Sequence, residues 1–343
     1  MKRFDNLFAE ITSVESLFQS WSLFRLGKRH RFDVQQFERE LEKNIFRLHR
    51  ALICKRYKHS PYQSFFIQDP KVRHIRKACV IDRLVHQAVY SQLYRIFEPK
   101  LIHHLYSSRL GKGTHKGVFA LKSAALKISK NNTRPCWALK CDVRKFYDSV
   151  DHEILFNLLK QSIKDQDALM LCREIIESFD IEGTPGKGLP IGNLTSQIFT
   201  NIYLNELDQF IKHTLRVKHY LRFADDFLLL SPNRKDLEET LPLLHSFLNE
   251  KLLLEIHPKK VSLRELHQGV DFLGYVTLPH HRVLRTTTKR RMIRKLSLRH
   301  KEYFDGKVTS ESLNQSLQSY LGILTHADAF EFQEDIKNSF CWR

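Results

Sequence analysis

Three aspartates stand where short apolar segments end, and such positions can build a metal site. Asp225 and Asp226 interrupt the apolar run 219–230, which predicts a strand, a tight turn and a second strand with both acids at the tip. Asp142 closes the apolar segment 137–142. Buried carboxylates are costly unless a cation neutralises them, and Mg²⁺ favours carboxylate and phosphate oxygens. An isolated Asp-Asp pair indicates a solvated turn, whereas these three acids predict a site for two-metal phosphoryl transfer.

Two helices are predicted beside these acids. The first begins after Asp142, where Ser149 or Asp151 is expected to cap it and Ile154 begins its apolar face. The second covers residues 196–212. Its expected apolar side consists of Phe199, Ile202, Tyr203 and Phe210, and it is interrupted by Glu206.

With these motifs in place, the chain resembles the palm and fingers of a reverse transcriptase. Phe146-Tyr147-Asp148 follows Asp142, and Gly188 opens the run GLPIGNLTSQ that ends at Gln197. The other matching segments are 71–75, 82–86, 106–115, 223–226, 257–260 and 269–275. Each piece alone would be a weak signal, but their collinear order from about residue 60 to about residue 290 is specific.

The resemblance reaches a subgroup. Pro190-Ile191-Gly192 departs from the Pro-Gln-Gly pattern of group II intron and retroviral enzymes. It is similar to the form in reverse transcriptases of diversity-generating retroelements and in related stand-alone, defence-associated bacterial enzymes. Segments 112–115 and 282–285 also resemble that group. Retron enzymes carry Val-Thr-Gly in the thumb, and Val308-Thr309-Ser310 is the nearest approach here.

The resemblance implies an α+β fold, the right-hand polymerase, with fingers, a palm of antiparallel sheet backed by helices, and a helical thumb. Its expected parts are residues 1–135 for N-terminal helices and fingers, 136–278 for the palm with an insertion at 161–187, and 279–343 for the thumb. Residues 1–65 are expected to be helical, and 111–134, rich in Gly, Lys, Ser and Asn, to include mobile parts. The Gly-rich segment 183–188 lacks P-loop spacing and predicts a turn.

The resemblance also implies catalytic and metal-binding roles. Asp142 and Asp225 would ligate two Mg²⁺ ions, for which Mn²⁺ is a possible substitute, with Asp226 as a looser third carboxylate. The backbone carbonyl of Val143 would join the second ion. Lys260 would protonate the leaving pyrophosphate.

Further residues would contact the incoming deoxynucleoside triphosphate. Lys71 and Arg73, spaced for one side of a strand, would bind its phosphates as charge-assisted donors, although ordinary surface charge is a competing interpretation. Arg109 would be a third phosphate or template contact. The ring of Tyr147 would lie against the sugar and exclude a ribose 2′-hydroxyl. The remaining expected contacts are Ile191 and Gln197, while the segment 272–275 would hold the primer end.

The composition agrees with a nucleic-acid partner. The 343 residues include 56 Lys and Arg against 38 Asp and Glu, a formal charge of +18 that predicts binding to a polyanion. Residues 281–301 alone carry nine Lys or Arg and no acid. They predict a helix capped within 286–288, with Met292 and Leu296 on its apolar face and Arg290, Arg291 and Arg294 opposite, facing a template–primer backbone.

The location expected from the sequence is the cytoplasm. No signal-peptide core, lipidation signal or long apolar span stands out, so no membrane partner is expected. The six cysteines show no Cys-x-x-Cys pairing and are expected to be reduced thiols, several of them in the core.

The function these features predict is RNA-directed DNA polymerase: synthesis of complementary DNA on an RNA template from a DNA primer. The partners expected are a dedicated non-coding RNA and an accessory protein, in a retroelement or an anti-phage defence system. Two alternatives stay open. One is a template-independent or protein-primed enzyme on the same palm. The other is a catalytically silent RNA-binding scaffold, against which the intact Asp142, Asp225 and Asp226 argue.

Overall fold

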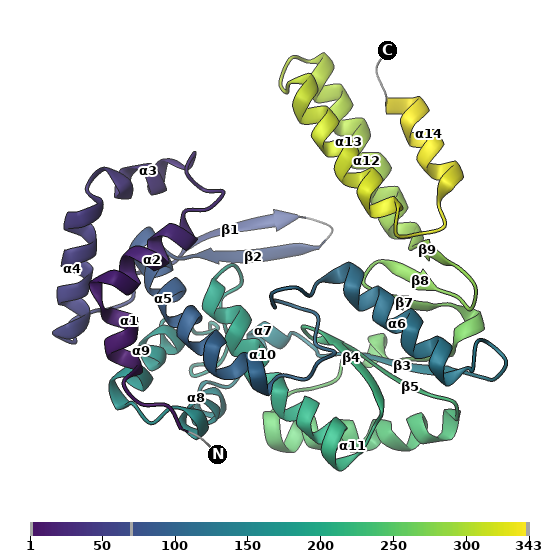
Figure 1. Cartoon of the computed structure of the whole chain (residues 1–343), viewed down its shortest axis with the longest axis horizontal. Helices are drawn as coiled ribbons and strands as arrows, with labels where there is room; N and C mark the ends of the chain where they lie inside the picture. Colours follow the sequence, from purple (N-terminus) through teal and green to yellow (C-terminus); the bar gives the residue numbers. More distant parts are fainter. Residues whose placement is uncertain (1–2, 69–70, 341–343) are drawn as a thin grey trace. The chain divides into compact units, whose positions relative to one another are not determined.

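The computed structural model describes residues 3–68 and 71–340, which form α-helices and small antiparallel sheets (Figure 1). These residues divide into two compact units, each assembled from separate stretches of the chain. Unit 1 comprises residues 1–103, 142–216 and 242–257, and unit 2 comprises 104–141, 217–241 and 258–343. The proposed division into fingers, palm and thumb therefore stays a prediction.

Unit 1 begins with five helices, of which the first three pack against the long helix α5 and α4 packs against those three. They are α1 (Leu7–Thr12), α2 (Val14–Phe24), α3 (Phe32–Arg39), α4 (Leu41–Ile53) and α5 (Val80–Phe97), with the 3₁₀ turn η1 (Glu98–Lys100) after α5. Ser13 caps α2 by accepting the Ser16 N–H. The indole of Trp21 lies 4.9 Å from the ring of Phe37, centroid to centroid, and is 1% exposed. The predicted N-terminal helices are therefore confirmed as far as Ile53.

A two-stranded hairpin separates α4 from α5. Strands β1 (Gln63–Gln68) and β2 (Val72–Lys77) pair antiparallel, with Phe66 opposite His74. All six residues of β1 are exposed. The hairpin projects from the helices of its unit (Figure 1), so neither of its faces is covered along its whole length.

The later segments of unit 1 supply further helices. They are α7 (Phe146–Ser149), α8 (His152–Ser162), α9 (Gln166–Glu177), α10 (Leu194–Gln209), the π-helical turn η2 (Phe210–Thr214), and the second half of α11 (Arg234–Leu252). Asp151 caps α8, as predicted, by accepting the N–H groups of Glu153 and Ile154. Helix α10 begins two residues before its predicted start. Glu206 is half-buried there, and burial raises the pKa of its carboxyl.

Unit 2 is built on a four-stranded sheet. Its strands are β3 (Trp137–Asp142), β4 (His219–Phe223), β5 (Asp226–Ser231) and β6 (Ser262–Glu265), in the order β4-β5-β3-β6. Helix α6 (Thr114–Ile128) packs Leu121 and Ala125 into a core with Leu221 and Leu228 of this sheet. The expectation of mobile parts within 111–134 is therefore wrong for the residues of α6, because they have a core to cover.

The C-terminal part of unit 2 joins a small sheet to a helical bundle. The short turns η3 (Pro258–Lys260) and η4 (Leu266–Gln268) flank β6, and strands β7 (Val270–Phe272), β8 (Tyr275–Thr277) and β9 (Arg282–Leu284) follow. Helices α12 (Thr286–Phe304), α13 (Ser310–Leu324) and α14 (Phe330–Phe340) complete the unit. Met292 and Leu296 are buried in its core, as predicted. The predicted cap is wrong: residues 286–288 form the first turn of α12, and its N-cap, Arg285, provides no side-chain cap.

Two chain-wide expectations can be compared with these elements. Of the six cysteines, Cys341 lies outside the described residues, and the other five are free thiols. Cys136, Cys141 and Cys172 are buried, which confirms that several belong to the core. Among the described residues, no helix is both long and apolar enough to cross a membrane.

Candidate active site

The two adjacent acids lie at the tip of the β4–β5 hairpin, as predicted. Phe223 pairs with Asp226, so Ala224 and Asp225 form a two-residue turn, and Ala224 adopts a left-handed φ of 53°. Two side chains hold this turn. The Ala224 N–H donates to Ser107 Oγ at 2.8 Å, and the buried guanidinium of Arg222 donates to the Ala224 carbonyl at 3.1 Å. The position of the acids is therefore fixed by contacts to the backbone of the turn itself.

A lysine that sequence reasoning missed neutralises one of these acids. Lys140 Nζ lies 3.1 Å from Asp226 Oδ2 and also donates to the Asp271 carbonyl at 3.0 Å. The two side chains are 19% and 20% exposed, so this ion pair is largely shielded from water. Lys140 precedes Asp142 by two residues in β3, and alternation along a strand places both on one face. That spacing was the available signal, but only the pairing of distant strands identifies the partner.

Asp142 ends β3, and the chain beyond it pairs with another segment of unit 1. The Asp142 carbonyl accepts the His257 N–H at 2.8 Å, and Val143, 1% exposed, pairs with Ile256. Lys260 lies three residues after His257 along the chain, in the turn η3. The backbone on both sides of the predicted metal ligands Asp142 and Val143 is thus anchored by hydrogen bonds.

The predicted metal site can be tested by the chemistry of its donors. Asp142, Asp225 and Asp226 supply carboxylate oxygens, the ligands that Mg²⁺ prefers. Within residues 3–68 and 71–340, no group of three or more His, Cys, Asp or Glu side chains lies close enough to hold a metal ion. The donor types therefore fit the ion, while the three-carboxylate site itself stays a prediction.

The loop that carries Ile191 is hydrogen-bonded to the C-terminal end of β2. The Arg76 N–H donates to the Ile191 carbonyl at 3.0 Å. Asn193, 3% exposed, donates through Nδ2 to the Arg76 carbonyl at 2.7 Å and accepts the Ala78 N–H through Oδ1 at 3.3 Å. Gly192 has a φ of +114°, and a Cβ there would lie 2.9 Å from Ile75 Cγ2, so the close approach requires glycine.

Tyr147 lies beside the same loop, because its carbonyl accepts the Leu189 N–H at 2.7 Å. Gln197 lies exposed in the first turn of α10, two residues after Thr195. Unit 1 therefore brings together Tyr147, Ile191 and the base of the hairpin that carries Arg73. These were predicted as separate motifs, and backbone hydrogen bonds make them neighbours.

The three predicted phosphate contacts, Lys71, Arg73 and Arg109, do not share one strand. Lys71 lies one residue before β2, so it is not a strand residue like Arg73, and the argument that both line one side of a strand is wrong in that respect. Arg73 is exposed and pairs with Ile67. Arg109 belongs to unit 2, where its guanidinium donates to the Leu105 carbonyl at 3.4 Å.

A cluster of buried polar side chains lies around helix α5 in unit 1. Asp82 is fully buried and accepts hydrogen bonds from the Tyr57 hydroxyl at 2.8 Å and the Ser60 N–H at 3.0 Å. His59 Nε2 lies 3.1 Å from His86 Nε2. Burial, and then the neighbouring His59, lower the pKa of His86 to about 3, so this imidazole is neutral at pH 7.

The two histidines extend this cluster through further hydrogen bonds. His59 Nδ1 lies 2.6 Å from the Ser60 carbonyl, which can only accept, so Nδ1 carries the proton. His59 Nε2 shares a hydrogen bond with His86 Nε2 at 3.1 Å, and His86 Nδ1 shares one with the Thr195 hydroxyl at 3.1 Å. Thr195 stands in the first turn of α10, four residues after Ile191. One chain of hydrogen bonds thus runs from the residues before β1 to the first turn of α10, directly after the loop that carries Ile191.

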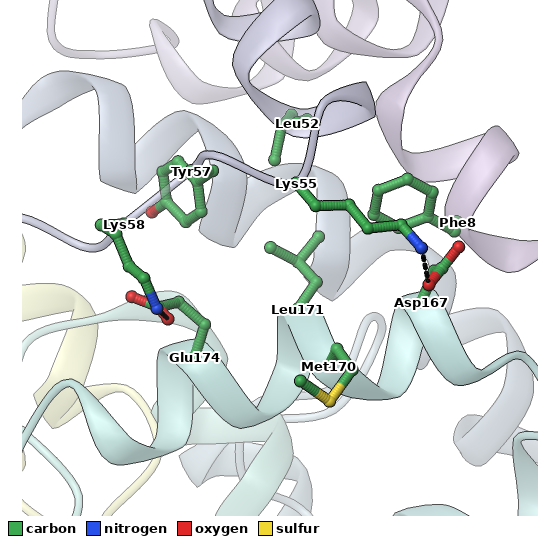
Figure 2. Close-up of a pocket in the computed structure, with 9 residues that line it drawn as sticks. All are labelled: Phe8, Leu52, Lys55, Tyr57, Lys58, Asp167, Met170, Leu171 and Glu174. Carbon is green, nitrogen blue, oxygen red and sulfur yellow. Dashed lines mark hydrogen bonds and ion pairs between the residues drawn. The ribbon is translucent and has the colours of Figure 1, made fainter.

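A pocket of about 290 Å³ lies in unit 1, and none of its lining residues belongs to the predicted site (Figure 2). Phe8, Leu52 and Leu171 provide apolar lining. Two ion pairs connect the segment after α4 to α9: Lys55 with Asp167 at 2.6 Å, and Lys58 with Glu174 at 2.7 Å. Nothing in its lining suggests nucleotidyl transfer, so we assign the pocket no role in that chemistry.

Helix α12 presents the predicted basic face. Arg290, Arg294 and Arg299 are exposed, while Arg291 is half-buried. Ile293, which follows the buried Met292, is 43% exposed. Arg299 pairs with Glu302 at 2.9 Å, one residue beyond the acid-free segment. The helix therefore offers a row of cations suited to phosphates.

Comparison with known proteins places these features in a family. The sequence profile described as reverse transcriptase (RNA-dependent DNA polymerase) matches residues 67–277, more than half of the chain. The group II intron-encoded protein LtrA of Lactococcus lactis is 22% identical over 364 residues, covering 86% of this chain and 57% of LtrA. Protein YkfC of Escherichia coli is 22% identical over 277 residues, covering 69% of this chain and 70% of YkfC. The chain thus spans little more than half the length of LtrA.

A solved structure supports the same fold. Telomerase from Candida albicans, in complex with a TWJ fragment of telomeric RNA, superposes with a TM-score of 0.50 at 13% identity. The match covers 83% of this chain and 60% of the telomerase chain. The mixed helix and antiparallel-sheet fold is therefore a polymerase fold, as predicted.

Proposed function

We propose that this chain, which belongs to the reverse transcriptase (RNA-dependent DNA polymerase) family, copies an RNA template into DNA. One observation carries the proposal: Asp225 and Asp226 occupy the tip of a hairpin whose turn is held by Ser107 and Arg222. Two adjacent carboxylates presented in this way, inside a reverse transcriptase domain, suit nucleotidyl transfer.

The proposed metal ligands are Asp142, Asp225, Asp226 and the Val143 carbonyl. Two Mg²⁺ ions held there, or Mn²⁺ in their place, would activate the primer 3′-hydroxyl and neutralise charge on the leaving pyrophosphate. Lys140 keeps Asp226 in place through its ion pair. Lys260 is proposed to give a proton to the pyrophosphate.

The nucleotide is proposed to bind at the loop where Tyr147, Ile191 and the base of the β1–β2 hairpin meet. The ring of Tyr147 would exclude a 2′-hydroxyl, and Ile191 and Gln197 would adjoin the base and sugar. Phosphate charge would be met by Lys71, Arg73 and Arg109. Hydrogen bonds to a charged group are about twice as strong as neutral ones, which favours cations in this role.

The proposed template is an associated structured RNA. A DNA primer would be extended along it with deoxynucleoside triphosphates, in the cytoplasm. The basic helix α12 supports a nucleic-acid partner through Arg290, Arg291 and Arg294. The departure at Ile191 from the Pro-Gln-Gly pattern supports a retroelement or anti-phage defence system, with or without an accessory protein. The genes beside this one distinguish the two: a template repeat next to a variable-protein gene, or a non-coding RNA in a defence island.

Primer extension on an RNA template tests the proposal. Asp225→Asn should lower DNA synthesis by at least the roughly 10²–10³-fold that loss of one transition-state electrostatic contact costs. Binding of template–primer should stay within a few-fold, because little of the basic surface changes. Asp335→Asn, at an exposed acid of α14, is the matched control and should leave both unchanged. Wild-type activity in the Asp225 variant would contradict the assignment.

The same assay separates the alternative functions. A template-directed enzyme makes product whose sequence complements the added RNA and makes none when the RNA is omitted. Product formed without template indicates a terminal transferase, and label that remains on the protein after denaturation indicates protein priming. Binding of RNA with no incorporation under any condition indicates a silent scaffold.

A further inference from the structure

Lys140 joins two hairpins of unit 2. Its Nζ lies 3.1 Å from Asp226 Oδ2, at the start of β5, and donates to the Asp271 carbonyl, in β7, at 3.0 Å. An ammonium group has three donors, so one lysine can serve both acceptors. The side chain is 19% exposed, and electrostatic contacts shielded from water are stronger than those in bulk solvent. One cation therefore bonds a proposed metal ligand and the backbone of a second hairpin.

The second hairpin contains the segment expected from the sequence to hold the primer end. Strands β7 and β8 pair Phe272 with Tyr275, which leaves a two-residue turn with Gly274 at its second position. Asp271 is the last residue before this segment. The contact from Lys140 to the Asp271 carbonyl therefore holds the backbone where it enters the primer segment.

Arg285 holds the same turn from its other side. The Arg285 N–H donates to the Gly274 carbonyl at 3.0 Å, and the guanidinium forms an ion pair with the Asp271 carboxylate. Arg285 is also the N-cap of the basic helix α12, and its carbonyl accepts the Lys289 N–H at 3.0 Å. The β7–β8 turn is thus bonded both by the cation that contacts Asp226 and by the residue at which α12 begins, all within unit 2.

We propose that Lys140 is a positioning residue that aligns the primer end with Asp226. The inference rests on the proposed function, because it takes Asp226 as a metal ligand and the β7–β8 turn as the holder of the primer. Reacting atoms must approach to about 3–3.5 Å, and a misplacement of about 1 Å can cost about 10²-fold in rate. A lysine that bonds both the acid and the turn fixes the distance between them.

Single-nucleotide incorporation on an RNA template tests the effect on rate. Lys140→Met keeps the approximate length of the side chain but removes its charge and donors. It should slow incorporation at saturating nucleotide by about 10- to 100-fold. Lys140→Arg keeps a cation with several donors and should come closer to wild type. Arg264→Met removes an exposed cation from the neighbouring strand β6 and, as the matched control, should leave the rate unchanged.

The position of the primer end can be measured without catalysis. 2-Aminopurine replaces the 3′-terminal base of the primer, and neither metal ions nor nucleotides are present. Stacking quenches this base, so its fluorescence should be low on wild type and higher on Lys140→Met, at an unchanged Kd for template–primer. Arg285→Gln frees the other side of the turn and should raise the signal too. It keeps the test decisive if Lys140→Met lowers the melting temperature.

The combined readouts decide the proposal. Slower incorporation and higher fluorescence in Lys140→Met, with Arg264→Met unchanged, support the alignment. Slower incorporation with unchanged fluorescence in Lys140→Met and Arg285→Gln would confine Lys140 to Asp226 and overturn it. So would wild-type behaviour of Lys140→Met in both assays, while leaving the polymerase function intact. A wild-type chain that quenches the primer end but incorporates no nucleotide would contradict the proposed function instead, and the fluorescence of the variants would still decide the role of Lys140.

Discussion

The chain contains two β-hairpins that are held in opposite ways. Along β4–β5, Leu221, Phe227 and Leu228 are at most 1% exposed, and the acids project from a tip whose strands are packed in the core. Along β1–β2, Phe65, Phe66 and Ile67 are all more than 40% exposed. The first hairpin is held along its length by apolar contacts, whereas the second is held at its base. A catalytic acid needs a fixed position, and the buried hairpin would provide it for the proposed metal ligands Asp225 and Asp226.

The base of the exposed hairpin is anchored by polar groups. Asn193 bonds the backbone of Arg76 and Ala78 at the end of β2. Asp82 and His86 belong to the buried cluster, and their side chains bond Ser60 and His59, which precede β1. Hydrogen bonds depend on geometry and protonation, while apolar contacts depend on volume. The two hairpins should therefore respond to different perturbations.

Removing volume from the buried hairpin should have the largest effect on stability. Leu228→Ala leaves a cavity and should lower the free energy of unfolding by about 2–5 kcal/mol. Ile67→Ala, in the exposed hairpin, should change it by no more than about 0.5 kcal/mol. Denaturant titrations of both variants measure the contrast. Similar losses in the two would show that the exposed strands are packed in solution.

Acid should act on the polar anchor. The pKa of His86 is lowered to about 3 from its ordinary value of 6.5, so the folded state favours the neutral ring. Its contribution to stability is present above pH 6.5 and is lost as the pH falls towards 3, with a slope of at most about 1.4 kcal/mol per pH unit. His86→Gln should flatten the pH dependence of unfolding in that window. His30→Gln, at an exposed position, should leave the slope unchanged. Parallel curves for His86→Gln and wild type would contradict a role for this ring.

Removing the hydrogen bonds of Asn193 should loosen the base of the β1–β2 hairpin. Asn193→Leu keeps the approximate volume but leaves the Ala78 N–H and the Arg76 carbonyl without this partner, at a cost of about 1–3 kcal/mol. Faster amide exchange at Ala78 and a higher KM for the incoming nucleotide should appear together. Asn314→Leu, on the exposed side of α13, is the matched control. A destabilised variant with an unchanged KM would limit Asn193 to folding.

The smallest expected effect concerns accuracy. Ile191 stands where many relatives have Gln, whose amide can hydrogen-bond near the nascent pair, and Ile can neither donate nor accept. One neutral hydrogen bond contributes about 0.5–1.5 kcal/mol, which is roughly a two- to tenfold change in discrimination. Ile191→Gln should therefore lower misincorporation by that factor. Sequencing of complementary DNA made by both versions on one template measures it, and equal error spectra would show that Ile191 only packs against its neighbours.

Local patterns were enough to predict the buried hairpin. The apolar residues around Asp225 and Asp226 indicate strands whatever surrounds them, and Asp151 has the features of a helix cap. Helix α6 was missed because the whole segment 111–134 was judged by its content of Gly, Lys, Ser and Asn, although Val118, Leu121 and Ala125 follow helical spacing. The buried side of α6 is marked by the helical spacing of its apolar residues, which the composition of the segment does not reveal.

The contacts that hold the site could not be predicted in the same way. Lys140 and Asp226 are far apart in the sequence, and their ion pair depends on which strands become neighbours. The hydrogen bond from Asn193 to the Arg76 carbonyl likewise joins two motifs that are separate segments in the sequence. Sequence therefore indicated which residues could do chemistry, while the groups that orient them follow from tertiary structure.

The alternation of the chain between two units has a consequence for its synthesis. Unit 1 needs residues 242–257, so its first segment, which ends at residue 103, leaves the ribosome long before the unit can close. At roughly 5–20 residues per second, translation of the intervening residues takes about 8–30 s. During that time Leu84 and Val85 of α5, buried in the finished protein, have only part of their final surroundings. The nascent chain is thus a natural client for chaperones until residue 257 has emerged.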